Sequence, residues 1–311
     1  MKIAFFTEMG FYGKVPRTHD NMRTEFAWMS ALNADHYNLR STPSTQYDLG
    51  IVIIPKKDPS FDINVLKQYC TKVAVMQEGP SWYWQDYSLD KQIWYYNTLI
   101  DSDIIFTHNQ SDKIYYQGLV NHSDVRVMQS LMIEDAIGTV AQIERKDVII
   151  GGNFVSWYGG FDSMIIAKEL SRGSNVYAPS MGRKQPLEDQ LVTHLPYVNW
   201  KQWIHELNKF KYGVHLMRTH AAGTFALNCA YLGIPCIGYK GLDTQMLCHP
   251  DLTVEVGDLI SARNISLKLR KDEEFYLYCS KLSKDMYNKH FSENTFKQKF
   301  YENFSNTADK K

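Results

Sequence analysis

The stretch HLMRTHAAGTFALNCAYLGIPCIGY, residues 215–239, decides the fold because a turn, a buried helix and a new strand follow one another within it. A polar turn at 218–224 precedes an almost wholly apolar run at 225–232, and that density of apolar residues is typical of a buried helix. Gly233 is placed to end the helix in the left-handed conformation, and Pro235 prevents its continuation. We therefore expect an α/β unit of strand, turn, buried helix and strand.

The beginning of this helix is a candidate anion site. The first N–H groups of a helix have no partner within it, and the helix dipole places partial positive charge at the same end. Gly223 and Thr224, with Arg218 in the turn before them, are therefore predicted to bind a diphosphate. The alternative is an ordinary connection between strand and helix with nothing bound, and this stretch alone leaves both open.

Composition excludes several classes of protein. Lys plus Arg (34) equals Asp plus Glu (34), so any surface that attracts nucleic acid or lipid must be local. The five cysteines include no CxxC pair, which favours reduced structural thiols. The first residues form a strand pattern rather than a signal peptide, and no segment approaches the roughly 18 apolar residues of a membrane span. These features predict a cytoplasmic protein.

Apolar runs alternate with helical patterns along the chain, which predicts parallel sheets with helices on both faces. The runs expected to be strands are 1–7, 47–55, 72–80, 103–109, 147–153, 175–178, 212–216, 236–238 and 253–256. A charged stretch at 141–146 separates two series, so we expect domains at 1–143 and 144–311, with the last helix packing back on the first domain. Two such sheets place their carboxyl ends at one crevice, where ligands bind.

The helix unit resembles the donor-binding half of GT-B glycosyltransferases, an α/β class of two doubly wound Rossmann-like domains that face a central cleft. GTFALNCAYLGIPCIGY (223–239), followed by Gln245 and PDLTV (250–254), carries the resemblance, and 149–167 is similar to the first strand and helix of that half. The resemblance implies a nucleotide sugar, linked to UDP, as co-substrate, with no permanently bound cofactor. It also implies that the backbone near Val198 reads the base of the nucleotide.

The chain departs from this class at two acidic positions. Many retaining members carry two glutamates eight positions apart, and the matching residues here are His220 and Asn228. The resemblance implies that Asn228 binds a ribose hydroxyl and His220 a sugar hydroxyl, since both side chains form hydrogen bonds. Gly159 stands where the class often has a lysine. The cations left for the phosphates are Arg218, Arg183 and Lys184.

A second resemblance lies in the first domain. Residues 73–109 are similar, in their order of elements, to the acceptor domain of small phage glucosyltransferases that modify hydroxymethylcytosine in DNA. It implies double-stranded DNA with a modified base as acceptor, in the host cytoplasm; a saccharide of a cell-surface polymer is the alternative. The local basic surface for DNA is expected from Lys14, Arg17, Arg23, Lys56 and Lys57. The residues expected to hold the acceptor are Gly10, Tyr12, Gly13, Trp82 and Trp84.

The acceptor hydroxyl needs a base if the reaction inverts configuration. Glu78, on a turn after a strand, is the first candidate for this catalytic role, followed by Glu8, His19 and Asp20. A retaining enzyme needs no such base, and Glu78 would then cap the following helix.

The sequence lacks the motifs that other classes of enzyme would need. Asp101-Ser102-Asp103 spells the D-x-D of metal-dependent transferases but precedes a strand instead of following one, so no metal site is predicted. No G-x-G-x-x-G follows a predicted strand, which disfavours a dinucleotide oxidoreductase. A sugar-nucleotide epimerase and a non-catalytic sugar-phosphate binder use the same architecture, and they stay open as alternatives of another class.

Overall fold

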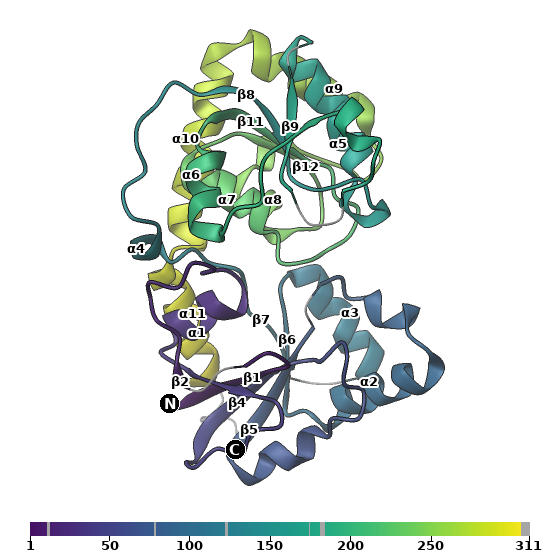
Figure 1. Ribbon diagram of the computed structural model, residues 1–311, viewed down its shortest axis with the longest axis vertical. Helices are drawn as coiled ribbons and strands as arrows, with labels where there is room; N and C mark the ends of the chain where they lie inside the picture. The colour runs from purple at the N-terminus through teal and green to yellow at the C-terminus, as the bar shows by residue number, and fades with distance from the viewer. Residues whose placement is uncertain (11–12, 78, 122–123, 174, 181–183, 306–311) are drawn as a thin grey trace.

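The computed structural model describes residues 1–10, 13–77, 79–121, 124–173, 175–180 and 184–305, and it consists of two α/β domains, one above the other in Figure 1. Within these ranges the first sheet has seven strands in the order β2-β3-β1-β4-β5-β6-β7, and the second has six in the order β10-β9-β8-β11-β12-β13. Neighbouring strands are parallel except β2 and β3. The predicted α/β class with two sheets is confirmed.

The first sheet is built around strands that are buried on both faces, as a parallel sheet between helices requires. Its strands are β1 (Ile3–Thr7), β2 (Gly13–Lys14), β3 (Asp35–Asn38), β4 (Tyr47–Ile53), β5 (Cys70–Met76), β6 (Ile104–Thr107) and β7 (Val125–Val127). The helical segments between them are α1 (Glu25–Ala31), η1 (Ile63–Gln68), η2 (Tyr83–Asp86), α2 (Leu89–Asp101) and α3 (Gln110–Val120).

The second sheet is covered by helices in the same way. Its strands are β8 (Lys146–Ile150), β9 (Val176–Ala178), β10 (Thr193–His194), β11 (Phe210–His215), β12 (Cys236–Tyr239) and β13 (Thr253–Val254). Its helical segments are η3 (Ser156–Tyr158), α5 (Gly160–Ser171), η4 (Glu188–Gln190), α6 (Trp200–Leu207), α7 (Thr224–Leu232), α8 (Asp243–Cys248), η5 (Pro250–Leu252), α9 (Leu259–Lys271) and α10 (Glu273–His290).

Helix α7 is the buried helix that the sequence predicts. Seven of its nine residues are buried, so its stability comes from packing within the second domain. Gly233 ends the helix with φ 68 and Gly223 precedes it with φ 64, both in the left-handed region. A Cβ at Gly223 would collide with the Thr244 hydroxyl, so only glycine fits this turn.

The chain crosses between the domains twice. Helix α4 (Glu134–Ile137) and the extended segment 138–145 lead to the second domain, and α10 followed by α11 (Glu293–Ser305) leads back (Figure 1). Phe300 of α11 is buried, and its ring stacks on that of Phe106 in β6, with centroids 6.0 Å apart. Arg126 of β7 donates to the carbonyl O of Asn303 at 2.8 Å. Helix α11 therefore belongs to the core of the first domain.

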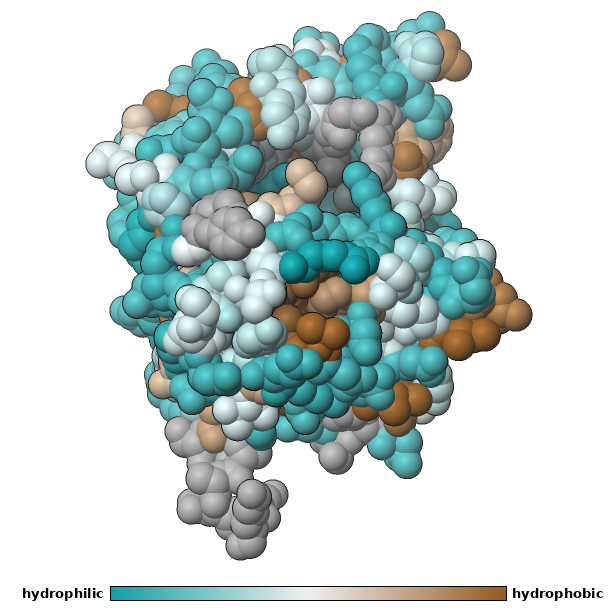
Figure 2. Space-filling view, turned by 60° about the horizontal axis from the view of Figure 1, so that its bottom comes forward, coloured by the Kyte–Doolittle hydropathy of each residue, from teal (hydrophilic) through white to brown (hydrophobic). Residues whose placement is uncertain are grey.

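The surface at the first-domain end is largely hydrophilic, with hydrophobic side chains in small separate groups (Figure 2). Among the described helices, none is both long and apolar enough to cross a membrane.

Candidate functional site

Two adjoining cavities lie where the carboxyl ends of the two sheets face each other. The cleft, about 450 Å³, has walls from both domains. The second cavity, here called the α6–α7 pocket, has about 200 Å³ and lies beside α6 and α7. Arg23, Gly151, Thr224 and Phe225 line both, so the two cavities form one continuous site. A cavity of about 740 Å³ under segment 138–145 is larger, but it includes Lys211 at the amino end of β11, away from the edge where ligands bind in such sheets.

The first turn of α7 opens at the junction of the two cavities. Ala221, Ala222, Gly223 and Thr224 line the cleft. The N–H groups of Ala222, Gly223 and Thr224 have no hydrogen-bond acceptor in the described part of the chain. Free N–H groups at the positive end of a helix dipole bind anions, so the turn can hold a diphosphate.

The α6–α7 pocket has largely apolar walls with several aromatic rings, which suit an aromatic ligand. Val198 and Asn228 line it, where the sequence analysis expects a base contact and a ribose contact. Its aromatic side chains are Tyr197, Trp200, Trp203 and Phe225. The Asn228 side chain has no hydrogen-bond partner among the residues described, so its amide is available to a ligand.

Helix α6 is held beside this pocket from two directions. Asn199 and Gln202 form a capping box at its first turn. The side chain of Asn21, in the first domain, accepts through Oδ1 a hydrogen bond from the backbone N–H of Trp200 at 3.2 Å. The backbone N–H of Lys201 donates to the carbonyl O of Asp20 at 3.2 Å. The first domain therefore fixes one wall of the pocket.

Two of the three cations expected at the phosphates, Arg218 and Lys184, line neither cavity. The Arg218 side chain is 55% exposed and donates to Oδ2 of Asp162 at 2.8 Å. This hydrogen bond and charge raise the pKa of Arg218 and tie the turn after β11 to α5. Lys184 is paired with Asp189. Arg183 lies outside the described residues.

Among the residues that the structure describes, Arg23 is the cation that lines both cavities. It comes from the first domain, and within the described ranges it has no ion pair. The next residue, Thr24, also lines the cleft and has φ 47, which is strained for a β-branched residue. Such strain is found most often at functional sites. From the sequence, Arg23 is expected only on a basic surface for DNA, because no sequence pattern connects it to α7.

His220 lies at the domain interface instead of in the sugar-binding part of the cleft. Its Nδ1 is 2.9 Å from the Ser111 hydroxyl and 3.7 Å from Oδ1 of Asp112, both in the first domain. It lines neither cavity, and its ring fills the space in which a side chain at Gly241 would stand. This geometry gives the expected sugar contact no support.

Two buried histidines that the sequence analysis does not single out line the cleft. His215, at the end of β11, is 6% exposed, and neither ring nitrogen has a hydrogen-bond partner among the described residues. Burial lowers the pKa of His215 to about 4, so its ring is neutral at pH 7, with one donor and one acceptor nitrogen. His108 follows β6 and stacks on Trp28, with ring centroids 5.4 Å apart. Their position at strand ends is the only sequence signal they carry.

The candidates for a catalytic base have different positions. Glu78 lies outside the described residues, while Gly79 and Pro80, which follow it, line the cleft. His19 and Asp20 line neither cavity. The ring of His19 stacks on Phe26, with centroids 4.6 Å apart, and its Nδ1 accepts from the N–H of Asn21 at 3.1 Å.

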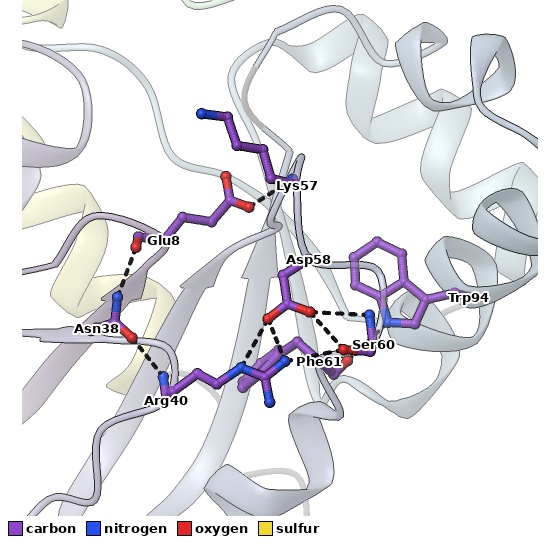
Figure 3. Close-up of polar contacts among 8 residues, drawn as sticks. All are labelled: Glu8, Asn38, Arg40, Lys57, Asp58, Ser60, Phe61 and Trp94. Carbon is purple, nitrogen blue, oxygen red and sulfur yellow. Dashed lines mark hydrogen bonds and ion pairs between the residues drawn. The ribbon is translucent and has the colours of Figure 1, made fainter.

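Glu8 takes part in a polar network at the carboxyl ends of β1, β3 and β4 (Figure 3). Its Oε1 accepts from the N–H of Lys57 at 2.7 Å, and its carbonyl O accepts from Nδ2 of Asn38 at 2.7 Å. Nearby, Arg40 donates through Nε to Asp58 at 3.0 Å. Glu8 therefore connects the loops that follow two neighbouring strands.

None of the expected acceptor residues that the structure describes lines the cleft. Trp84 is 7% exposed and stacks on Tyr95 in the core, with centroids 5.1 Å apart, so its position gives the assignment to the acceptor no support. Trp82 is half-buried, and its neighbour Tyr83 lines the cleft. The ring of Tyr83 meets that of Trp157 from the second domain at 6.4 Å, so the two domains touch through aromatic rings here.

The loop after β1 packs closely on β3. A Cβ at Gly10 would collide with the carbonyl O of Tyr37, so glycine is needed there for backbone approach. Gly13 begins β2 with φ 89 and has open space around it. Tyr12 lies outside the described residues. Neither glycine lines the cavities, so their expected contact with an acceptor stays a prediction.

Two of the five residues of the basic surface expected for DNA are neutralised by ion pairs. Lys14 pairs with Asp35 at 2.9 Å, and Arg17 pairs with both Asp135 and Glu293. Lys56 lines the cleft, and the Lys57 side chain points away from the network in Figure 3. In the part of the chain that the structure describes, no group of three or more His, Cys, Asp or Glu residues is arranged to hold a metal ion.

In comparisons by sequence, no protein-family model and no curated protein matches this chain. In structure, it is similar to S. aureus TarM in a complex with UDP (TM-score 0.63, 8% identity, 82% of this chain and 55% of TarM). This chain thus spans about half the length of TarM.

Two other solved structures are similar over almost their whole length. Anabaena HepE in complex with UDP-glucose has a TM-score of 0.67 and 11% identity, covering 98% of this chain and 100% of HepE. An alpha-glucosyltransferase in complex with UDP and DNA containing an HMU base has a TM-score of 0.61 and 13% identity, covering 98% and 99%. These likenesses show that the chain has the GT-B fold, which confirms the fold that the sequence resemblance implies.

Proposed function

We propose that the protein is a glycosyltransferase that moves a sugar from a UDP-sugar to the hydroxyl of an acceptor. The observation that carries this proposal is the position of the first turn of α7, whose free N–H groups open between the α6–α7 pocket and a cleft shared by both domains. In this proposal uracil and ribose occupy the pocket, the diphosphate lies at the turn, and the sugar extends into the cleft. The likeness to HepE and to the alpha-glucosyltransferase, both bound to UDP or UDP-glucose, supports it.

Each part of the donor has a proposed partner. The backbone near Val198 reads the base, and the Asn228 amide binds a ribose hydroxyl. The N–H groups of Gly223 and Thr224 bind the diphosphate, and Arg23 supplies a positive charge from the opposite domain. Arg218 would join them only by leaving Asp162.

The reaction breaks the bond between the anomeric carbon and the diphosphate oxygen and forms a bond from the acceptor oxygen to that carbon. Negative charge builds on the leaving diphosphate, where the N–H groups of the first turn of α7 and the side chain of Arg23 stabilise it without a metal ion. The acceptor proton passes to a base or to the leaving phosphate. Glu78 remains the first proposed base, and Glu25 and His108 are candidates because they line the cleft.

For the acceptor we propose a hydroxymethylated pyrimidine in DNA, with a saccharide as the second candidate. The full-length likeness to a DNA-bound alpha-glucosyltransferase supports the first, and Tyr83, Trp157 and Tyr158 offer ring surfaces to an extruded base. The ion pairs of Lys14 and Arg17 favour the second, because they remove charge that duplex DNA would need.

The test combines purified protein, a panel of UDP-sugars and two acceptor sets: DNA with hydroxymethylcytosine or hydroxymethyluracil, and oligosaccharides. Mass spectrometry of digested nucleosides and of the saccharides then reports any transferred sugar. We expect transfer to persist in EDTA. Conversion of one UDP-sugar into its epimer, or no reaction and no binding of UDP, would refute the proposal.

A further inference from the structure

Two successive carbonyl groups in the turn before α7 are anchored by the first domain. The Asn109 side chain donates through Nδ2 to the carbonyl O of Ala221 at 2.8 Å. The Ser130 hydroxyl donates to the carbonyl O of Ala222 at 2.7 Å. Both side chains are almost fully buried, with Asn109 1% and Ser130 3% exposed, so these hydrogen bonds are shielded from water.

The orientation of the Asn109 amide is fixed by its other contacts. Its Oδ1 accepts from the N–H of Asp243 at 3.0 Å, which leaves Nδ2 to face the carbonyl of Ala221. In return, Oδ2 of Asp243 accepts from the N–H of Gln110 at 3.0 Å. Helices α3 and α8 thus cap each other across the domain interface, and this holds Asn109 in place.

The anchored carbonyls determine where the neighbouring N–H groups point. A trans peptide group carries its C=O and N–H on opposite sides, and the described chain contains no cis peptide bond. Anchoring Ala221 and Ala222 by their carbonyls therefore turns the N–H groups of Ala222 and Gly223 away from the first-domain side chains. Both residues line the cleft, and both N–H groups lack an acceptor among the residues that the structure describes.

A third carbonyl is anchored from within the second domain. The Thr244 hydroxyl donates to the carbonyl O of Gly223 at 3.0 Å, which orients the N–H group of Thr224 in the same way. Two of the three anchors of this turn therefore come from the opposite domain.

We propose that Asn109 and Ser130 are positioning residues of the donor site: side chains of the first domain direct the peptide N–H groups with which the second domain binds the diphosphate. The inference rests on the proposed function and deepens it. It follows that the diphosphate site is complete only when the first domain is docked against the turn.

The test uses the full chain and three probes: UDP, inorganic pyrophosphate and uridine. Ser130→Ala and Asn109→Ala each remove an anchor, and Ser130→Thr keeps the hydroxyl. Ser111→Ala is the matched control, because Ser111 also bonds across the interface, to His220 and Gly241, but does not touch the turn carbonyls. Affinities are measured by calorimetry and, for weak probes, by NMR titration.

We expect Ser130→Ala and Asn109→Ala to weaken UDP and pyrophosphate about threefold to tenfold, the range for losing one hydrogen bond. Uridine affinity should stay unchanged, since a loss of packing would weaken all three probes alike. Ser130→Thr should restore binding, and Ser111→Ala should match the wild type.

Three results would overturn the proposal: unchanged pyrophosphate affinity in both alanine variants, an equal loss for uridine, or a wild-type protein that binds neither pyrophosphate nor UDP. A wild type that binds pyrophosphate but not UDP would refute the UDP-sugar function alone, and weaker pyrophosphate binding by Ser130→Ala would still support the positioning role.

Discussion

Replacing Arg23 by alanine should weaken UDP binding more than replacing Arg218, although Arg218 is much closer in sequence to α7. Arg23 lines both cavities, and none of the described carboxylates forms an ion pair with it. Arg218 lines neither, and its guanidinium is held by Asp162. Comparing the two variants therefore shows whether closeness in the sequence or closeness in the fold determines which arginine binds the nucleotide.

The magnitude follows from the surroundings of each side chain. A hydrogen bond to a charged group contributes about 1.5–3 kcal/mol, and the exposure of Arg23 argues for the lower end. We expect Arg23→Ala to cost about 1.5 kcal/mol, or about tenfold in the Kd for UDP. Arg218→Ala removes a surface ion pair, which contributes at most about 1 kcal/mol to folding and should change the Kd by less than about twofold.

The assay is calorimetry of UDP binding at low and high salt, with Arg23→Lys as the control that keeps the charge. Arg23→Ala should also reduce the salt dependence of binding, because it removes a charge that faces the phosphates. A tenfold loss for Arg218→Ala with no change for Arg23→Ala would refute this reasoning. It would mean that the pair with Asp162 opens when the nucleotide binds.

Three further changes test the turn, a buried histidine and the base. Gly223→Ala should lower the free energy of unfolding by about 1–2 kcal/mol or more, because the new Cβ meets the Thr244 hydroxyl at φ 64; equal urea midpoints would contradict this. The pKa of His215, about 4, lies below the ordinary 6.5, so unfolding takes up a proton between these values and stability falls as pH drops from about 6.5 to 4. His215→Gln should reduce the pH dependence of the free energy of unfolding by up to about 1.4 kcal/mol per pH unit. If urea melts showed the same pH dependence for this variant and the wild type, His215 would not be the group responsible. Glu78→Gln should lower transfer by about 10²-fold or more with UDP affinity retained; normal turnover would favour a retaining mechanism without a base.

The donor half of the molecule could be predicted because its signals are local. Gly223, the apolar run after it, Gly233 and Pro235 specify a turn, a buried helix and its end within some 15 residues of sequence, and α7 has these bounds. Asn228 lines the α6–α7 pocket from α7, the helix that this local pattern predicts, and Val198 lines it from the coil just before α6.

The missed elements lack such signals. Strand β3 has the sequence DHYN, without an apolar run, and it becomes a strand through pairing with β1 and β2. Trp84 lies in an aromatic run at 82–84, and sequence alone cannot tell which of three neighbouring rings faces the core; Trp84 packs on Tyr95 and Tyr83 lines the cleft. Tertiary packing decides both cases.

Charged side chains were the least predictable part of the site because their partners are distant in the sequence. Arg218 is held by Asp162, 56 residues away, and Arg17 by Glu293, 276 residues away. Long side chains pair with whatever the fold brings near, and no spacing rule reveals it. Arg23 was missed for the same reason: it is far from α7 in the sequence and lies near it only because the two domains face each other.

In the proposed donor site the first domain contributes at three separate places, so nucleotide binding is expected to be a property of the interface. Asn21 fixes the first turn of α6, Arg23 faces the phosphate site, and Asn109 with Ser130 orients the turn before α7. A ligand that binds the docked arrangement better than the separated one stabilises docking by that difference in affinity. UDP binding should thus hold the two walls of the cleft together. The acceptor, which lies between those walls, then meets a cleft that the donor itself has ordered.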